Sequence, residues 1–138
     1  MKKFLLVNIL FVSVLFAFVL QSCEKKNNII GKWRLVSEDY YFNGEICGCR
    51  IPSFDEMICE FKANGIVDIY EYGEFTATKK YTYNKNIIVI TENDDKEYSE
   101  TFEVIKLTSK YMEWKFSGKE SGYTTNWFFL NISLITNH

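Results

Sequence analysis

Few side chains in this sequence of 138 residues have the chemistry of a catalytic centre. The one histidine, His138, is the last residue, and a chain terminus is a poor place for a general base or a metal ligand. This count excludes Ser–His and Cys–His catalysis and the usual zinc centres. The seven glycines are scattered singly, so no glycine-rich phosphate-binding loop is present. We therefore predict that the chain is not an enzyme and holds no metal or cofactor.

Acidic side chains are the remaining candidates for catalysis, because two carboxylates about 5–10 Å apart in a cleft can hydrolyse glycosidic bonds. Glu92, Asp94 and Asp95 lie in one expected turn, while Glu113 and Glu120 are expected to point outward. Such positions are typical of solvated carboxylates, so a carboxylate hydrolase is the weakest of the hypotheses considered.

Three of the four cysteines, Cys47, Cys49 and Cys59, follow Cys23 within the first half of the chain. In an oxidising compartment we expect a disulfide from Cys49 or Cys47 to Cys59, which would close a loop of about ten residues and contribute about 2–3 kcal/mol. A direct bond from Cys47 to Cys49 would be strained, because one residue separates them. The alternatives are free buried thiols, or three thiolates around a metal ion without a fourth ligand.

The N-terminal segment has the pattern of a targeting signal. Lys2 and Lys3 precede an apolar run from Phe4 to Leu20, whose length is at the short end of a membrane span. The run ends in Leu20-Gln21-Ser22-Cys23, which resembles the lipobox of bacterial lipoproteins, in particular the envelope lipoproteins of Bacteroidota. The alternative is an anchor helix with an incidental cysteine.

This resemblance implies a signal peptide over residues 1–22, a lipid on Cys23 and a short tether over residues 23–28. The lipid would hold the protein at the outer membrane of a bacterial envelope, on its periplasmic or its outer surface. Without Lys2 and Lys3 the chain keeps 14 Lys and Arg against 18 Asp and Glu, a net charge of about −4. A nucleic-acid partner is therefore not expected.

Residues 29–138 are predicted to form one all-β domain of short strands separated by turn signals. Eight strands are expected, at Ile30–Tyr40, Phe54–Lys62, Ile66–Tyr72, Glu74–Tyr83, Ile87–Thr91, Lys96–Leu107, Tyr111–Ser117 and Gly122–Ile132. The first two are joined by a long connection, Tyr41–Ser53, and Asn64-Gly65 is the strongest hairpin turn. Alternation predicts shared faces for the sets Trp33, Leu35, Ser37; Met57, Cys59, Phe61; Phe75, Ala77, Tyr81, Tyr83; and Met112, Trp114, Phe116.

Eight antiparallel strands form either a sandwich or a closed barrel. Closure removes exposed edges, and an eight-stranded barrel has an interior that side chains fill or that holds one small ligand. Phe, Tyr and Trp make up 17% of the residues, enough bulky side chains to line or fill such an interior. The sequence therefore favours an eight-stranded antiparallel up-and-down β-barrel.

Gly31-Lys32-Trp33, at the start of the first expected strand, is similar to the Gly-x-Trp signature of lipocalins. The resemblance implies that Trp33 closes one end of the barrel and that the domain is lipocalin-like, as in many Bacteroidota lipoproteins. The chain departs from the pattern in lacking the Thr-Asp-Tyr motif and an arginine in the last strand. These departures weaken an inference of ligand carriage more than they weaken the barrel.

Two functions follow, and they differ in what fills the barrel. In the first, a small apolar or amphipathic ligand occupies the interior of the barrel. The aromatic side chains that line this interior are Trp33, Tyr81, Tyr83, Trp114, Phe116, Trp127 and Phe129. In the second, these side chains fill the core and the connection Tyr41–Ser53 binds another protein of the envelope or an extracellular target. Closure of the interior by Trp114, Tyr81 and Phe129 would favour the second.

Overall fold

The computed structural model describes residues 28–92, 98–117 and 122–133. Within them the chain forms one antiparallel sheet of nine strands. The strands are β1 (Gly31–Phe42), β2 (Glu45–Arg50), β3 (Ile58–Phe61), β4 (Ile66–Glu71), β5 (Glu74–Asn84), β6 (Ile87–Thr91), β7 (Ser99–Leu107), β8 (Tyr111–Ser117) and β9 (Tyr123–Asn131).

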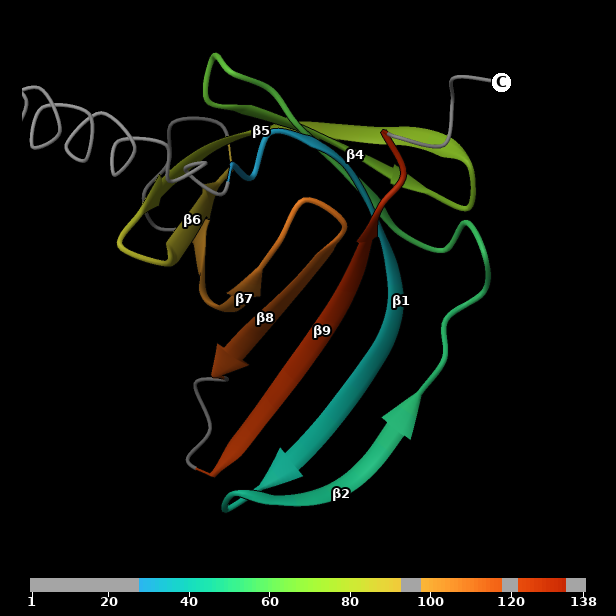
Figure 1. Ribbon diagram of the computed structural model, residues 1–138, viewed down its shortest axis with the longest axis vertical. Helices are drawn as coiled ribbons and strands as arrows, with labels where there is room; N and C mark the ends of the chain where they lie inside the picture. The colour runs from blue at the N-terminus through green and yellow to red at the C-terminus, as the bar shows by residue number, and fades with distance from the viewer. Residues whose placement is uncertain (1–27, 93–97, 118–121, 134–138) are drawn as a thin grey trace, which may run out of the picture.

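Eight of the nine strands close into a barrel, because β1 also pairs with β9. From β3 to β9 each strand pairs with the next along the chain, and β3 returns to the first half of β1. This confirms the predicted all-β, eight-stranded antiparallel barrel (Figure 1). The predicted signal peptide, Cys23 and most of the tether lie outside the described residues.

The ninth strand, β2, occupies part of the stretch expected to be a connection. β1 runs to Phe42, turns at Asn43 and Gly44, and pairs with β2 through residues 38–42. Both turn residues have positive φ, 50° and 83°, the geometry that Asn-Gly pairs favour in tight hairpins. The prediction of an unpaired connection over Tyr41–Ser53 is therefore wrong in its first part.

β-bulges change which side chains face inward. In β1, Leu35 lies opposite Phe129 but Ser37 lies opposite Phe128, so one extra residue reverses the alternation. Ser37 therefore points outward, contrary to prediction, and Glu38 turns inward, where it is only 6% exposed. A second bulge, between β4 and β5, leaves Phe75 outside the barrel rather than inside.

The core fills the barrel interior with apolar side chains from almost every strand. Trp33, Phe61, Trp114 and Phe129 are its largest members together with Phe102, and each is at most 2% exposed. The faces predicted for the second and seventh expected strands are confirmed, since Cys59, Phe61, Met112 and Trp114 are buried while Met57 and Phe116 pack against the same core.

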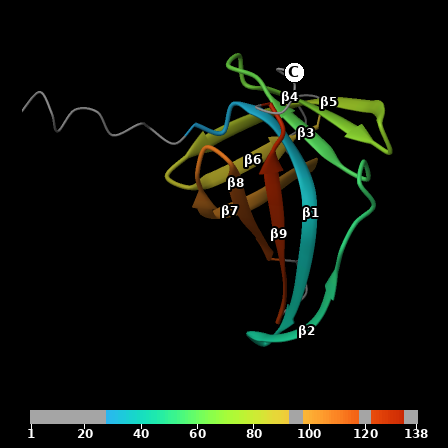
Figure 2. The ribbon, with the colours of Figure 1, turned by 45° about the vertical axis from the view of Figure 1, so that its right-hand side comes forward.

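The barrel has two unlike ends, which we call the Trp33 end and the β2 end. At the Trp33 end, the residues before β1 fold over Trp33, whose Nε1 donates to the carbonyl oxygen of Ile29 at 2.7 Å. The β2 end is the part where β1 and β9 run on beyond the shorter strands and β2 is added to β1 (Figures 1 and 2).

Candidate functional site

The seven aromatic residues predicted to line the interior all turn toward it. Trp33, Trp114 and Phe129 are fully buried. The other four, Tyr81, Tyr83, Phe116 and Trp127, are partly buried and pack against the core. Two members of this cluster, Phe61 and Phe102, are not among the seven, although alternation within β7 (Phe102 and Val104 inward) is the signal that identifies Phe102.

Trp114 is the centre of this aromatic cluster. Its ring centroid lies 4.5 Å from that of Phe129, 5.0 Å from Phe102, 5.8 Å from Phe61 and 6.4 Å from Trp127. These four partners come from β9, β7 and β3, so the rings meet across the barrel. Aromatic pairs at such distances stabilise a core beyond the area that they bury.

Among the described residues, Trp114 Nε1 is the buried side-chain polar atom without a hydrogen-bond partner. By contrast, the indole N–H of Trp33 is satisfied by Ile29. A buried donor of this kind usually has an acceptor close by, such as a water molecule or a ligand atom.

At the β2 end the inward face is polar. Register places Trp114, Trp127, Glu38 and Arg50 side by side across β8, β9, β1 and β2. The Glu38 carboxylate accepts hydrogen bonds from Tyr40 Oη at 2.8 Å and from Arg50 Nε. Because its hydroxyl donates to this carboxylate, the pKa of Tyr40 is raised above its usual value.

Arg50 ties this network to the connection between β2 and β3. Its Nη1 donates to Glu56, while its Nε donates to Glu38. The Arg50 hydrogen bond, helped by the Ser53 backbone N–H, lowers the pKa of Glu56. The network therefore links Glu56, in this connection, to β1 through Arg50, and Leu35 N adds a backbone hydrogen bond to the carbonyl oxygen of Met57.

The connection and the β4–β5 hairpin are joined by a hydrogen bond from Tyr72 N to Glu56 O at 3.4 Å, and both carry exposed apolar side chains, which we call the apolar patch. The patch consists of Ile51, Phe54, Tyr72 and Phe75, which are 84%, 72%, 71% and 60% exposed. Tyr72 has a φ of 52°, a left-handed conformation that costs a bulky residue about 1–2 kcal/mol. The hairpin tip thus displays an aromatic ring where the backbone would favour glycine.

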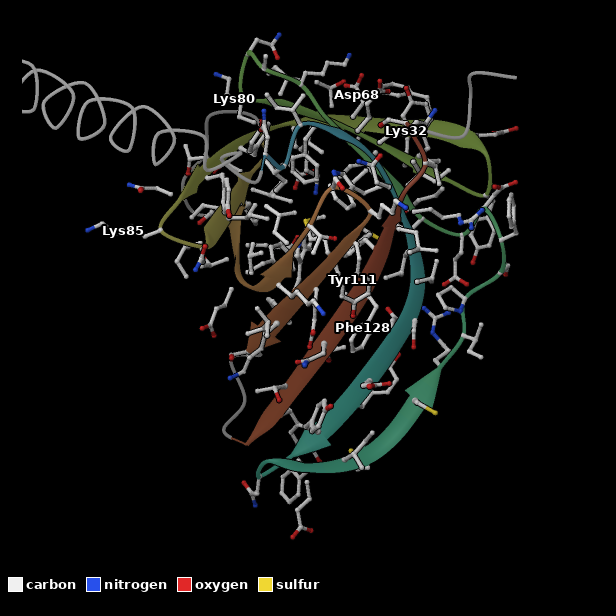
Figure 3. The ribbon with its side chains drawn as sticks, viewed as in Figure 1. Lys32, Asp68, Lys80, Lys85, Tyr111 and Phe128 are labelled. Carbon is white, nitrogen blue, oxygen red and sulfur yellow. The ribbon has the colours of Figure 1, made fainter. Side chains whose placement is uncertain are left out.

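A second polar cluster lies on the outer face, near the Trp33 end. Asp68 accepts hydrogen bonds from Lys62 Nζ and, at 2.7 Å, from Thr78 Oγ1. The Lys62 bond is the larger cause of a lowered pKa at Asp68. Lys32 and Asp68 lie at the same end of the molecule, whereas Tyr111 and Phe128 lie lower on β8 and β9 (Figure 3).

The predicted disulfide between Cys49 or Cys47 and Cys59 is wrong, since all three thiols are free. Cys59 lies opposite Trp33 and Cys49 opposite Asp39, and six residues of β1 span about 20 Å. A disulfide needs Cα atoms within about 7 Å. Burial raises the pKa of the Cys59 thiol to about 12, whereas Cys47 and Cys49 are exposed. The alternative of free buried thiols holds for Cys59, whereas the thiols of Cys47 and Cys49 are free but exposed.

The acidic candidates are dispersed or lie beyond the described part of the chain. Asp94, Asp95, Glu120 and His138 belong to residues that the structure does not describe. Each of the two buried carboxylates, Glu38 and Asp68, has a basic partner. Within the described residues, no three Cys, His, Asp or Glu side chains gather as metal ligands, and no helix is long and apolar enough to cross a membrane.

The fold defines a closed antiparallel barrel with an aromatic interior and one polar, extended end. No protein-family model matches the chain, and no curated protein matches its sequence. Its fold is similar to the crystal structure of an uncharacterized protein from Bacteroides eggerthii, with a TM-score of 0.52 and 19% sequence identity. The match covers 75% of this chain and 99% of that chain. At this identity the likeness concerns the fold alone.

Proposed function

We propose that this chain is a lipid-anchored, lipocalin-like protein of the bacterial cell envelope that binds another protein and is not an enzyme. The filled interior carries this proposal. The side chains expected to line a ligand pocket belong to one apolar core or pack against it, and Trp114 contacts Trp127 and Phe129 within it. Tight packing of this kind stabilises a barrel and leaves its surface to select a partner.

The exposed apolar patch is the surface that this function would use. Ile51 lies in the predicted binding connection, and Phe54 directly follows it. Neighbouring apolar side chains with this exposure are typical of protein–protein contact sites. Phe54 is not wholly free, since the Arg34 guanidinium lies 4.0 Å from its ring centroid. A cation over the ring orients it, so less conformational entropy would be lost on binding.

The envelope location is supported by the N-terminal sequence. Leu20-Gln21-Ser22-Cys23 has an apolar residue three positions before the cysteine and a small residue directly before it. Lipid at Cys23 would keep the barrel within a few nanometres of the outer membrane, because residues 23–28 are a short tether. The partner would then be a protein of that membrane or one that reaches it.

Site-specific cross-linking tests the proposal in the native envelope. A photo-reactive amino acid replaces Ile51 in the full chain, and we expect one defined cross-linked product. Phe54→Ser should abolish this product, whereas Leu130→Ser should leave it unchanged, because Leu130 is exposed but lies outside the patch. No product, or a product that survives Phe54→Ser, would contradict the proposal.

A second candidate function, binding of a small amphipathic ligand, is favoured by the unpaired Trp114 Nε1. A ligand oxygen could accept this hydrogen bond while its apolar part contacts Trp127 and Phe116, which are partly exposed. Native mass spectrometry of the full chain, extracted gently from its own envelope, tests this function. A reproducible adduct that Trp114→Phe removes would support it, and a bare protein mass would argue against it.

A further inference from the structure

Among the residues that the structure describes, β2 is an open edge of the sheet. Its one neighbour in the strand order is β1, and all six of its residues, Glu45–Arg50, are exposed. Figures 1 and 2 show it at the margin of the sheet, with no described strand on its outer side. An open edge presents unpaired N–H and C=O groups to which another strand can add.

β2 lacks two common means of protecting such an edge, although a β-bulge lies at Cys47. Proteins commonly place proline or lysine on an edge strand, and β2 has neither. Its basic residue, Arg50, is bound to Glu38 and Glu56 of its own chain. The centre of the strand, residues 46–49, carries no charge at all.

Gly48, in that centre, is not required by the fold of a single chain. It lies outside the residues with positive φ, and a Cβ added there would meet only Tyr40 Cδ2, at an ordinary contact distance of 3.7 Å. Glycine within a strand costs about 0.5–1 kcal/mol relative to alanine. Such a glycine often marks a place where another backbone approaches closely.

The two exposed thiols flank this glycine symmetrically, as Cys47-Gly48-Cys49. When two β2 strands pair antiparallel about Gly48, each Cys47 lies opposite the Cys49 of the other copy. Residues opposite one another in antiparallel strands have Cα atoms about 4.5–5.5 Å apart, within the span of a disulfide. The segment is therefore complementary to a second copy of itself, as a two-fold interface requires.

We propose that two copies of this chain pair antiparallel through their β2 edges and are joined by two disulfides, each from Cys47 of one copy to Cys49 of the other. Cys47 is free and exposed, and as the extra residue of a bulge it has no residue opposite it on β1. Its thiol makes one long contact, 3.4 Å to the carbonyl oxygen of Tyr40. This interface goes beyond the proposed function and uses the edge of β2 rather than the apolar patch.

A small disulfide such as oxidised glutathione supplies the oxidising equivalents. The Cys49 thiolate attacks it, forms a mixed disulfide and releases one reduced glutathione. The Cys47 thiolate of the second copy then attacks the mixed disulfide and releases the other glutathione. For each bond formed, two protein thiols lose two electrons and two protons, and one glutathione disulfide is reduced to two thiols. Cys59 takes no part, because it is buried.

Oxidation of the full chain tests the proposal, with Cys23→Ser present so that its thiol does not contribute. The protein is held in detergent with oxidised glutathione, and intact masses are measured without reductant. We expect a covalent dimer whose mass is short of four hydrogen atoms. Cys59→Ser is the matched control and should still give this dimer.

Two single variants test the register. Cys47→Ser alone and Cys49→Ser alone should each give no covalent dimer, whereas their mixture should give a heterodimer with one disulfide. A dimer from Cys47→Ser alone would overturn the proposed register. A monomer short of two hydrogen atoms, or glutathione adducts alone, would overturn the interface itself. Since these outcomes do not involve Ile51 or Phe54, they leave the proposed function to its own test.

Discussion

The Trp33 end and the β2 end of the barrel differ in the residues that cover the core. At the Trp33 end the indole N–H is paired with Ile29, and the surrounding inward side chains are apolar. At the β2 end, Glu38 and Arg50 continue the inward face, and the strands extend past the core. Apolar closure contributes stability alone, whereas a carboxylate buried on the inward face and an open edge break the usual rules of packing, as proteins do at functional sites. This contrast places the Glu38–Arg50 pair and the open edge of β2 at the same end of the barrel.

The largest expected effect is the loss of Trp33. Trp33→Ala should lower the free energy of unfolding by about 3–5 kcal/mol, because it removes a fully buried ring and leaves a cavity. Trp127→Ala, at the β2 end and partly exposed, should cost less than half as much. Urea denaturation followed by circular dichroism measures both, and equal losses would show that the two ends are equally packed.

Removal of the Glu38 carboxylate should have the next largest effect. Glu38→Ala removes the hydrogen-bond acceptor of Tyr40 and one of the two ion-pair partners of Arg50. We expect the free energy of unfolding to fall by about 1–2 kcal/mol. The loss is limited because Arg50 is half-exposed and keeps its ion pair with Glu56. The exposed Glu71→Ala is the control, with a change within about 0.5 kcal/mol. A loss at Glu38 no larger than the control would mean that the network does not hold the connection.

Two glycine substitutions compare a turn that needs glycine with a strand that does not. Gly65→Ala should cost about 1–2 kcal/mol, because φ at this turn is +79°. Gly48→Ala should raise the free energy of unfolding by about 0.5–1 kcal/mol, since an alanine Cβ fits there. A large loss at Gly48 would mean that the single chain needs this glycine after all.

The smallest expected effect is on the pH dependence of stability, to which Asp68 and Glu56 contribute because their pKa values are lowered. Because folding lowers the pKa of Asp68, its stabilisation is complete above the unfolded value of about 3.9 and is lost as the pH falls through the folded value. Unfolding measured from pH 7 down to pH 3 should therefore show a weaker loss of stability in Asp68→Asn. Glu56→Gln should likewise weaken the dependence of the free energy of unfolding on pH. An unchanged slope in both variants would contradict these assignments.

The parts of the molecule that follow strict alternation were predictable. The inward positions of Cys59, Phe61, Met112 and Trp114 follow from period-two patterns over short strands. Ser37 and Phe75 were assigned to the wrong face because each lies just beyond the register shift of a bulge. A bulge depends on which residue lies opposite on another strand, and local alternation carries no such information.

The candidate site was predictable only in part, for the same reason. The aromatic residues of the interior could be identified, because an eight-stranded barrel needs bulky side chains inside. The Glu38–Arg50 pair could not, since it joins residues that come together only when β2 folds back along β1. Asn43-Gly44 was the available signal for that hairpin.

The sequence by itself determined the closed all-β barrel and the identity of most core residues, because alternation and turn signals act over a few residues. It also carries the lipobox-like Leu20-Gln21-Ser22-Cys23, whose role stays a prediction. The tertiary structure alone decided that the thiols stay apart, that a ninth strand leaves an open edge and that aromatic rings fill the centre. Each of these depends on strand register and closure, which bring together residues far apart in the chain.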